Sequence, residues 1–240
     1  MSDRFFLAEP PTGGRAILQG DEARHCCRVL RARVGDTIRV FDGRGMEWPA
    51  SITALARDTV TVTLAEPLSA ESIPRGQLTL AVALPKGERQ KWLVEKLTEL
   101  GAARLVPLVT ERGVAEATEG ARARLERGVI EACKQCGRNT LMDIAAPATL
   151  GELAARHPAS LRLIAHPGGM PLCDRPITSP GQEMQEVVAA IGPEGGFTPE
   201  ELELATAAGF RPVSLGSHIL RIETAAIALA SWKTLSFTSA

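Results

Sequence analysis

The chain has 240 residues, enough for one large domain or two small ones. Hydrophobic residues make up 45% of it, the usual share for a folded protein with a sizeable core. The formal net charge of −1 excludes attraction to nucleic acid through bulk charge, so any polyanion contact must come from local patches. All bases in residues 1–70 are arginine, which suits phosphate contacts, although a GC-rich genome explains this composition slightly better.

The 5 cysteines are odd in number and show no disulfide framework. The chain begins without a basic segment followed by an apolar run, and no apolar stretch reaches about 18 residues. We therefore expect a cytoplasmic protein that does not enter the membrane. Cys133 and Cys136 form a single pair on the apolar stripe of a predicted helix, which favours core packing, and we expect no metal.

Residues 1–70 are predicted to form a compact β-barrel domain, because short alternating segments are separated by turn signals. The polar stretch 67–76, which ends in Pro74-Arg75-Gly76, is the predicted linker. The predicted strands are Arg4–Ala8, Ala16–Gln19, Thr37–Phe41, Met46–Leu55 and Thr59–Leu64, with one short helix at Asp21–Arg28.

Residues 77–240 are predicted to form an α/β domain, because apolar runs now alternate with helical patterns. Strands that read as almost continuous apolar runs are typical of a parallel sheet covered by helices. The predicted strands are Leu78–Leu84, Arg104–Val109, Leu161–Ala165, Glu186–Ile191 and Val213–Leu215, and the predicted helices include Glu88–Leu100 and Glu119–Cys136.

A glycine-rich loop, Gly192–Phe197, follows one of these apolar strands directly. Thr198, Pro199 and Glu201 then predict a helix start with a capping box. A glycine loop between the carboxyl end of a strand and a helix N-terminus is typical of a ligand site in an open α/β sheet. An ordinary tight connection is the alternative. The absence of a following Gly-Lys-Ser/Thr argues against a nucleotide-phosphate loop.

A second loop, Leu215–Ala225, leads into the alanine-rich segment Ala225–Leu235, which is apolar on nearly all faces. Such a helix must be covered on two sides, and we expect its own sheet and a partner subunit to cover it. Arg221 and Glu223 lie at its entrance. A buried pair there either orients a substrate or braces the loop, and the sequence leaves both possibilities open.

These two loops resemble the signature stretches of the RsmE family, namely Ile191-Gly-Pro-Glu-Gly-Gly-Phe-Thr-Pro-Glu-Glu201 and Leu215-Gly-x-x-Ile-Leu-Arg-x-Glu-Thr-Ala225. The family comprises SPOUT-class enzymes that methylate N3 of one uridine in small-subunit (16S) ribosomal RNA. The resemblance covers the whole chain. Arg4-Phe5-Phe6 and His25-x-x-x-Val29-Leu30-Arg31 are similar to its PUA-like RNA-binding domain, and Lys96-x-x-Glu99-Leu100-Gly101 and Glu131-Ala132-x-x-Gln135-x-x-Arg138 match its central motifs. The chain departs from the family at Lys134, His218 and Ile222, where Glu, Arg and Thr are usual.

The resemblance implies a SPOUT α/β domain with a trefoil knot, a homodimer, and S-adenosylmethionine (AdoMet) as cofactor. Most cofactor contacts are expected from the backbone of three loops. The implied cofactor residues are His166, Pro167, Gly168, Ile191, Gly192, Pro193, Glu194, Gly195, Gly196, Leu215, Gly216, Ile219, Leu220, Arg221, Thr224 and Ala225. The sequence also predicts that Gly195→Val abolishes AdoMet binding, because a side chain there would occupy ligand space.

Methylation of uracil N3 requires removal of a proton, so a base or a cation that stabilises the uracil anion is expected. The candidate bases are Glu194 and Glu223, and the candidate cations are Arg138 and Arg221; each is equally explained as part of a structural ion pair. The candidate RNA contacts are Arg4, His25, Arg28, Arg31, Lys86 and Arg89. Two other functions stay open: a SPOUT methyltransferase acting on tRNA or on a ribose hydroxyl, and a non-catalytic rRNA-binding assembly factor.

Overall fold

The computed structural model describes residues 3–70, 77–113, 119–172 and 186–235. Its contacts divide the chain into two compact units, the first formed by residues 1–73 with 130–141 and the second by residues 74–129 with 142–240. Residues 130–141 were expected in the second domain. They belong to the first unit because side chains such as Lys134 and Asn139 bind Glu22 and Glu47. Cys173 lies outside the described residues.

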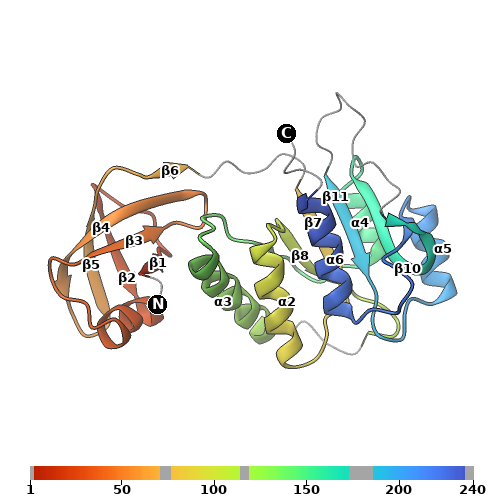
Figure 1. Ribbon diagram of the computed structural model, residues 1–240, viewed down its shortest axis with the longest axis horizontal. Helices are drawn as coiled ribbons and strands as arrows, with labels where there is room; N and C mark the ends of the chain where they lie inside the picture. Colours follow the sequence, from red (N-terminus) through yellow and green to blue (C-terminus); the bar gives the residue numbers. More distant parts are fainter. Residues whose placement is uncertain (1–2, 71–76, 114–118, 173–185, 236–240) are drawn as a thin grey trace. The chain divides into compact units, whose positions relative to one another are not determined.

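The first unit is built on a six-stranded sheet with the order β1-β3-β4-β5-β2, in which β6 pairs with β4. The pairing is antiparallel except between β1 and β3. No pairing between described residues joins β2 to β1, so the predicted β-barrel is an open half-barrel (Figure 1). Its strands are β1 (Arg4–Phe6), β2 (Arg15–Gln19), β3 (Thr37–Phe41), β4 (Met46–Leu55), β5 (Thr59–Leu64) and β6 (Ser69–Ala70).

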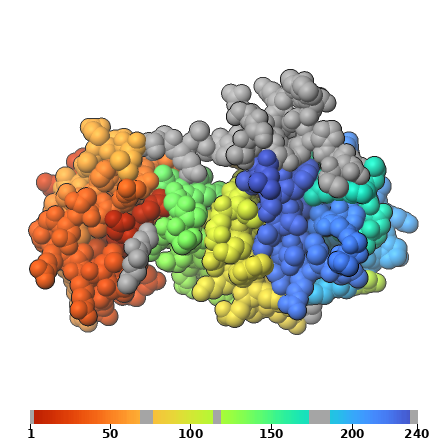
Figure 2. Space-filling view, viewed as in Figure 1, coloured from red at the N-terminus to blue at the C-terminus, as the bar shows by residue number. Residues whose placement is uncertain are grey.

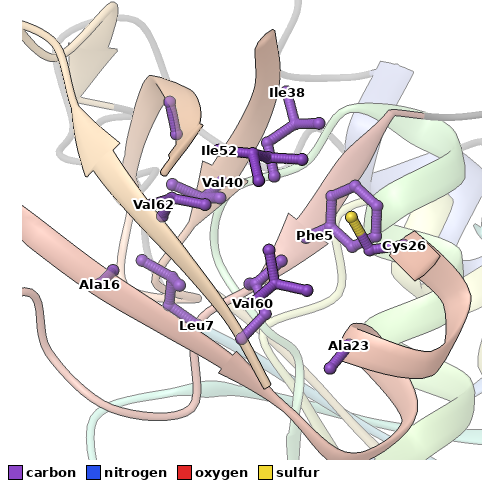
Figure 3. Close-up of a cluster of buried hydrophobic side chains, with 12 residues drawn as sticks. Phe5, Leu7, Ala16, Ala23, Cys26, Ile38, Val40, Ile52, Val60 and Val62 are labelled. Atoms are coloured by element: carbon purple, nitrogen blue, oxygen red, sulfur yellow. The ribbon is translucent and has the colours of Figure 1, made fainter. Parts of the chain in front are cut away.

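The core of this unit lies on the inner face of the sheet. Alternation in β5 buries Val60 and Val62, and Figure 3 shows Val62 close to Val40 of β3 and Ile52 of β4. The predicted helix Asp21–Arg28 is a short α1 (Gly20–Arg24) followed by a π-helical segment, η1 (His25–Val29). This segment turns the Cys26 side chain toward the sheet.

The second unit contains a six-stranded parallel sheet with the order β12-β10-β11-β7-β8-β9, which confirms the predicted parallel sheet. Every residue of β7 and β11 is buried, as expected for strands covered on both faces. The strands are β7 (Leu78–Val82), β8 (Arg104–Pro107), β9 (Asp143–Ile144), β10 (Leu161–Pro171), β11 (Val187–Ile191) and β12 (Arg211–Ser214).

Helices cover both faces of this sheet. One face packs against α4 and α5 through a core that includes Leu153, Val188 and Ala205. On the other face α6 contacts β7 and β11 and lies beside α2 (Figure 1). The helices are α2 (Glu88–Glu99), α3 (Glu119–Cys136), α4 (Leu150–Arg156), α5 (Pro199–Ala207) and α6 (Ile222–Leu235). Among the described residues, no helix has both the length and the apolarity that a membrane span requires.

Candidate active site

A cavity of about 370 Å³ lies in the second unit, where three chain segments meet. They are Ala165–Pro167 within β10, Ile191–Phe197 after β11, and residues from Ser214 to Ile222 that join β12 to α6. Strands β12, β10 and β11 are neighbours in a parallel sheet, so these segments converge near the carboxyl ends of the strands. The volume is within the range of small-molecule sites.

The glycine loop has a defined shape because a capped helix follows it. The Thr198 side chain accepts a hydrogen bond from the Glu201 N–H at 3.2 Å, and the Glu201 carboxylate accepts one from the Thr198 N–H at 2.9 Å. This is the predicted capping box, with Pro199 at the start of α5. Within the loop, the Gly196 N–H donates to the Pro193 carbonyl at 2.8 Å, and Gly196 takes a φ of +68°, which favours glycine.

Most of the cofactor residues implied by the resemblance line this cavity: His166, Pro167, Ile191, Gly192, Pro193, Glu194, Gly195, Gly196, Leu215, Gly216, Ile219, Leu220 and Ala225. Three others, Gly168, Arg221 and Thr224, do not line it. Gly168 contacts a lining residue, because its N–H donates a hydrogen bond to His166 Nδ1 at 3.1 Å.

The lining also includes Ala165, Phe197, Ser214, His218 and Ile222, which were not among the expected cofactor residues. Phe197 had a signal in the sequence, because it ends the glycine loop. Its ring lies so close to Gly192 that a Cβ on Gly192 would meet it at 2.9 Å. The other four residues have no side-chain pattern that distinguishes them from ordinary loop positions.

The chemistry of the lining limits the ligand class. Among the described residues that line it, Glu194 is the only one with a formal charge, and none is a lysine or an arginine. A phosphorylated ligand would lack its usual cationic partners there. A ligand with a flat apolar part and a positive charge fits better, because glycine-rich backbone supplies hydrogen bonds and Glu194 supplies a negative charge. The residues present therefore fit AdoMet.

A charged cluster lies at the edge of the cavity. Arg89 Nη1 donates to Glu194 Oε1 at 3.1 Å and lies 3.9 Å from Glu223 Oε2. The expected pair between Arg221 and Glu223 is therefore corrected. Glu223 is buried and faces Arg89, whereas Arg221 is exposed.

The Arg112 side chain holds the glycine loop from outside, donating from Nη1 to the Gly195 carbonyl at 2.7 Å. A Cβ on Gly195 would meet Arg112 Cδ at 3.3 Å. A valine there would therefore displace Arg112 as well as narrow the cavity. We now expect Gly195→Val to weaken AdoMet binding by about tenfold, the worth of one hydrogen bond to a charged group, instead of abolishing it.

Calorimetric titration of AdoMet into the folded Gly195→Val variant measures this effect. Arg112→Ala is the matched control, because it removes the same hydrogen bond and leaves the glycine in place. We expect a similar or smaller loss from the control. Unchanged affinity in both variants would refute the role of Arg112 in holding the loop.

The candidate RNA contacts of the first unit lie in different environments. Arg28 and Arg31 are exposed, and Arg31 is the only non-glycine residue of the described chain with a positive φ, +52°. His25 is half-buried, with its ring 5.7 Å from that of Phe5 and its Nδ1 3.5 Å from Lys134 Nζ.

Arg4 is buried, which corrects its assignment as an RNA contact. Its guanidinium binds the Glu47 carboxylate at 3.2 Å, the Cys133 carbonyl at 2.7 Å and the Asn139 side chain. It also lies 4.8 Å from the centre of the Phe41 ring. A phosphate could reach it only by displacing these partners, so Arg4 has a structural role.

The remaining candidates are placed as follows. Lys86 is exposed in the second unit, just before α2. Arg138 is half-buried and belongs to the first unit, whereas the cavity lies in the second, and its catalytic role stays a prediction.

Cys133 is buried as predicted, but Cys136 is exposed because it ends α3. The described residues contain no group of three or more side chains suited to a metal ion.

Comparison with known proteins decides the family. A family model described as an RNA methyltransferase domain matches residues 71–233, and one described as an RNA methyltransferase PUA domain matches residues 18–65. A relative from Synechocystis sp., named ribosomal RNA small subunit methyltransferase E, is 39% identical over 219 residues, covering 87% of this chain and 69% of the relative. This chain belongs to the ribosomal RNA small subunit methyltransferase E family.

Solved structures of similar proteins agree with this RsmE membership. The structure of ribosomal RNA small subunit methyltransferase E from Neisseria gonorrhoeae bound to S-adenosylmethionine superposes with a TM-score of 0.85 at 31% identity, covering 96% of both chains. A methyltransferase from Legionella pneumophila, solved with bound S-adenosylmethionine, gives a TM-score of 0.86 at 32% identity and covers 98% of both chains. The RsmE fold therefore extends over the whole chain.

Proposed function

We propose that this chain transfers the methyl group of AdoMet to N3 of one specific uridine in 16S ribosomal RNA. The observation that carries the proposal is the cavity beside β10 and after β11 and β12, where residues of both signature loops meet. Two structural neighbours above 30% identity were solved with S-adenosylmethionine bound. Two relatives of this chain share the name ribosomal RNA small subunit methyltransferase E, which supports the small ribosomal subunit as the source of the RNA.

The proposal is tested in a strain that lacks this protein. Nucleosides from its small-subunit rRNA are analysed by mass spectrometry and compared with those of the parent strain. We expect one 3-methyluridine to be absent from the deletion strain and restored by the intact gene. Loss of a ribose methylation, or of a tRNA modification instead, would identify another SPOUT activity. An unchanged rRNA profile would favour a non-catalytic assembly factor.

Catalysis in this proposal depends mainly on positioning, since methyl transfer needs an in-line approach and no covalent help from the protein. AdoMet supplies an electrophilic methyl group when bound. The protein must supply a group that accepts the N3 proton of uracil. Glu194 suits this role because it lines the cavity and stays 48% exposed. Glu223 is too deeply buried for direct proton transfer, with a side chain only 7% exposed.

The first unit is proposed to dock the RNA, with Arg28 and Arg31 as contacts. Both side chains are exposed, and arginine binds phosphate with a planar, two-pronged donor set. Because Arg31 has a positive φ, Arg31→Asn is preferable to alanine, since asparagine tolerates that conformation. We expect Arg28→Gln with Arg31→Asn to weaken rRNA binding and to reduce the slope of log affinity against log salt by about 1–2.

Filter binding at several salt concentrations measures this slope, and calorimetry should show unchanged AdoMet affinity. Arg57→Gln, at another exposed arginine of the first unit, is the control. A wild-type methylation rate of the double variant at subsaturating RNA would mean that these arginines only brace the helical segment.

We also propose a homodimer through α6. This helix leaves Ala228 and Trp232 half-buried and Leu235 72% exposed. Ala228 and Trp232 border an apolar groove of about 470 Å³ together with Leu172. Figure 2 shows the blue surface of this C-terminal segment uncovered in that view. A second copy would remove this apolar surface from water.

Light scattering at micromolar concentration should therefore give the mass of a dimer. Ala228→Glu should shift it to a monomer, because the new carboxylate would be buried in the interface. Leu204→Glu, at an exposed leucine of α5, is the control and should stay dimeric. A monomeric wild-type protein would contradict the proposal.

Two finer features complete the proposal. The second unit is expected to contain a trefoil knot, a recognised exception to the usual rule against knots. This expectation rests on the similarity of the chain to the RsmE family. The substrate is expected to be the assembled small subunit, which places the protein in the cytoplasm.

A further inference from the structure

Arg89 has a position that neither signature loop accounts for. It lies in the first turn of α2, yet its guanidinium reaches Glu194 on the glycine loop and approaches Glu223 at the start of α6. Three separate elements thus bring one cation and two carboxylates together. Glu194 lines the cavity, so the guanidinium lies at the cavity's edge.

The two carboxylates that face Arg89 differ in burial. The Glu223 side chain is 7% exposed, and its Oε2 atom is buried with no hydrogen-bond partner among the described residues. A buried carboxylate needs a nearby cation, because burial without one is costly. Arg89, at 3.9 Å, is the cation that the structure provides. Glu223 is therefore suited to hold the Arg89 guanidinium in place.

Arg89 itself keeps donors available. Its side chain is 39% exposed, and both contacts with the carboxylates use Nη1. Its Nη2 and Nε groups make no hydrogen bond to another described residue and can bind another molecule. A guanidinium presents these donors in one plane, which matches a flat acceptor that carries negative charge.

The proposed reaction produces such an acceptor. When uracil loses its N3 proton, the negative charge spreads over N3 and the two carbonyl oxygens. A positioned cation lowers the free energy of this anion in a partly desolvated site. In this step the N3–H bond breaks, the proton passes to Glu194, and the N3 electron pair forms the bond to the methyl carbon. The electron pair of the broken sulfur–methyl bond stays on sulfur.

We propose that Arg89 contacts the target uracil and stabilises its N3 anion, and that Glu223 is the positioning residue for Arg89. This inference rests on the proposed function. It replaces a general RNA contact at Arg89 with a specific one at the reacting base. The two roles differ in what they affect: a phosphate contact changes affinity and salt dependence, whereas stabilisation of the anion changes the pH dependence of the transfer step.

The test uses the full-length protein, AdoMet and small ribosomal subunits that lack the modification. Transfer is followed in a single turnover at saturating RNA between pH 6 and pH 9. The variants are Arg89→Met, Arg89→Lys and Glu223→Gln. Lys91→Met is the matched control, because it removes the same charge from an exposed position of α2. Calorimetric AdoMet binding and thermal unfolding show whether each variant is folded with its cofactor site intact.

Arg89→Met should slow transfer at pH 7 by about 100-fold or more, the usual effect of losing an oxyanion donor. Its rate should recover as the pH rises, because hydroxide then removes the proton that Arg89 no longer helps to release. Arg89→Lys should be intermediate, since it keeps the charge and loses the planar donor set. Glu223→Gln should show a smaller shift of the profile in the same direction. Lys91→Met should match the wild type.

A second measurement separates this role from RNA docking. Replacing the target uridine by 5-fluorouridine lowers the pKa of N3, so it should restore much of the rate of Arg89→Met and change the wild-type rate less. Equal effects in both proteins, or an unchanged pH profile with weaker RNA binding, would overturn the inference and leave Arg89 as a phosphate contact. If the wild-type protein makes no 3-methyluridine at all, the proposed function fails instead.

Discussion

Gly216→Val should reduce the affinity for AdoMet by about 5- to 150-fold while the protein stays folded. Gly216 lines the cavity with a φ of +132°, a conformation that a β-branched residue does not adopt without strain. Strain of this kind costs about 1–3 kcal/mol, and each 1.4 kcal/mol corresponds to about a tenfold change in affinity. The exposed loop can relax in the free protein, so the cost arises when AdoMet restores the bound shape.

Calorimetric titration of AdoMet measures this loss. Gly209→Val is the matched control, because Gly209 also has a positive φ, +82°, but does not line the cavity. The control should lower the free energy of unfolding and leave AdoMet affinity unchanged. Wild-type affinity in a folded Gly216→Val protein would contradict the role assigned to the loop that joins β12 to α6.

Arg4→Met should destabilise the first unit by about 3–5 kcal/mol, the range for removing one partner of a buried ion pair. The Glu47 residue would remain buried at 8% exposure without its main cation, and the Cys133 carbonyl would lose a donor at 2.7 Å. Replacing both partners, with Arg4→Met and Glu47→Leu, should be less harmful, because no uncompensated charge remains.

Urea unfolding of the variants tests this expectation. Arg39→Ala is the control, because Arg39 lies 3.8 Å from the same carboxylate but is 56% exposed, and such pairs contribute about 1 kcal/mol or less. A loss below about 1 kcal/mol for Arg4→Met would contradict the structural role of Arg4. It would reopen the possibility that this arginine binds RNA.

The sequence predicted the regular elements well where local patterns determine them. The bounds of β3, β4, β5 and α3 agree with the expected ones, because alternation or a helical stripe ends at clear turn signals there. The capping box at Thr198 was also predictable from three residues. The short β9 was missed, because a two-residue strand has no periodicity of its own.

The candidate site was predictable only in part. Clustered glycines after an apolar run predict a loop at the end of a strand, so the sequence alone was enough to locate the loop Gly192–Gly196. The partner of Glu223 could not be predicted from the sequence, because Arg89 lies 134 positions earlier in the chain and approaches Glu223 only through the packing of α2 beside α6. The burial of Arg4 was likewise hidden, since its partners Cys133 and Asn139 come from a distant helix and the loop that follows.

The central claim is that this chain methylates uridine N3 in small-subunit rRNA with AdoMet. The most direct measurement incubates the purified protein with methyl-deuterated AdoMet and small subunits from the deletion strain, digests the RNA to nucleosides, and analyses them by mass spectrometry. We expect labelled 3-methyluridine from the subunits, and less of it when Gly216→Val replaces the wild-type protein at low AdoMet concentration. A deuterated methyl group on a ribose oxygen or on another base, or no transfer at all, would contradict this claim.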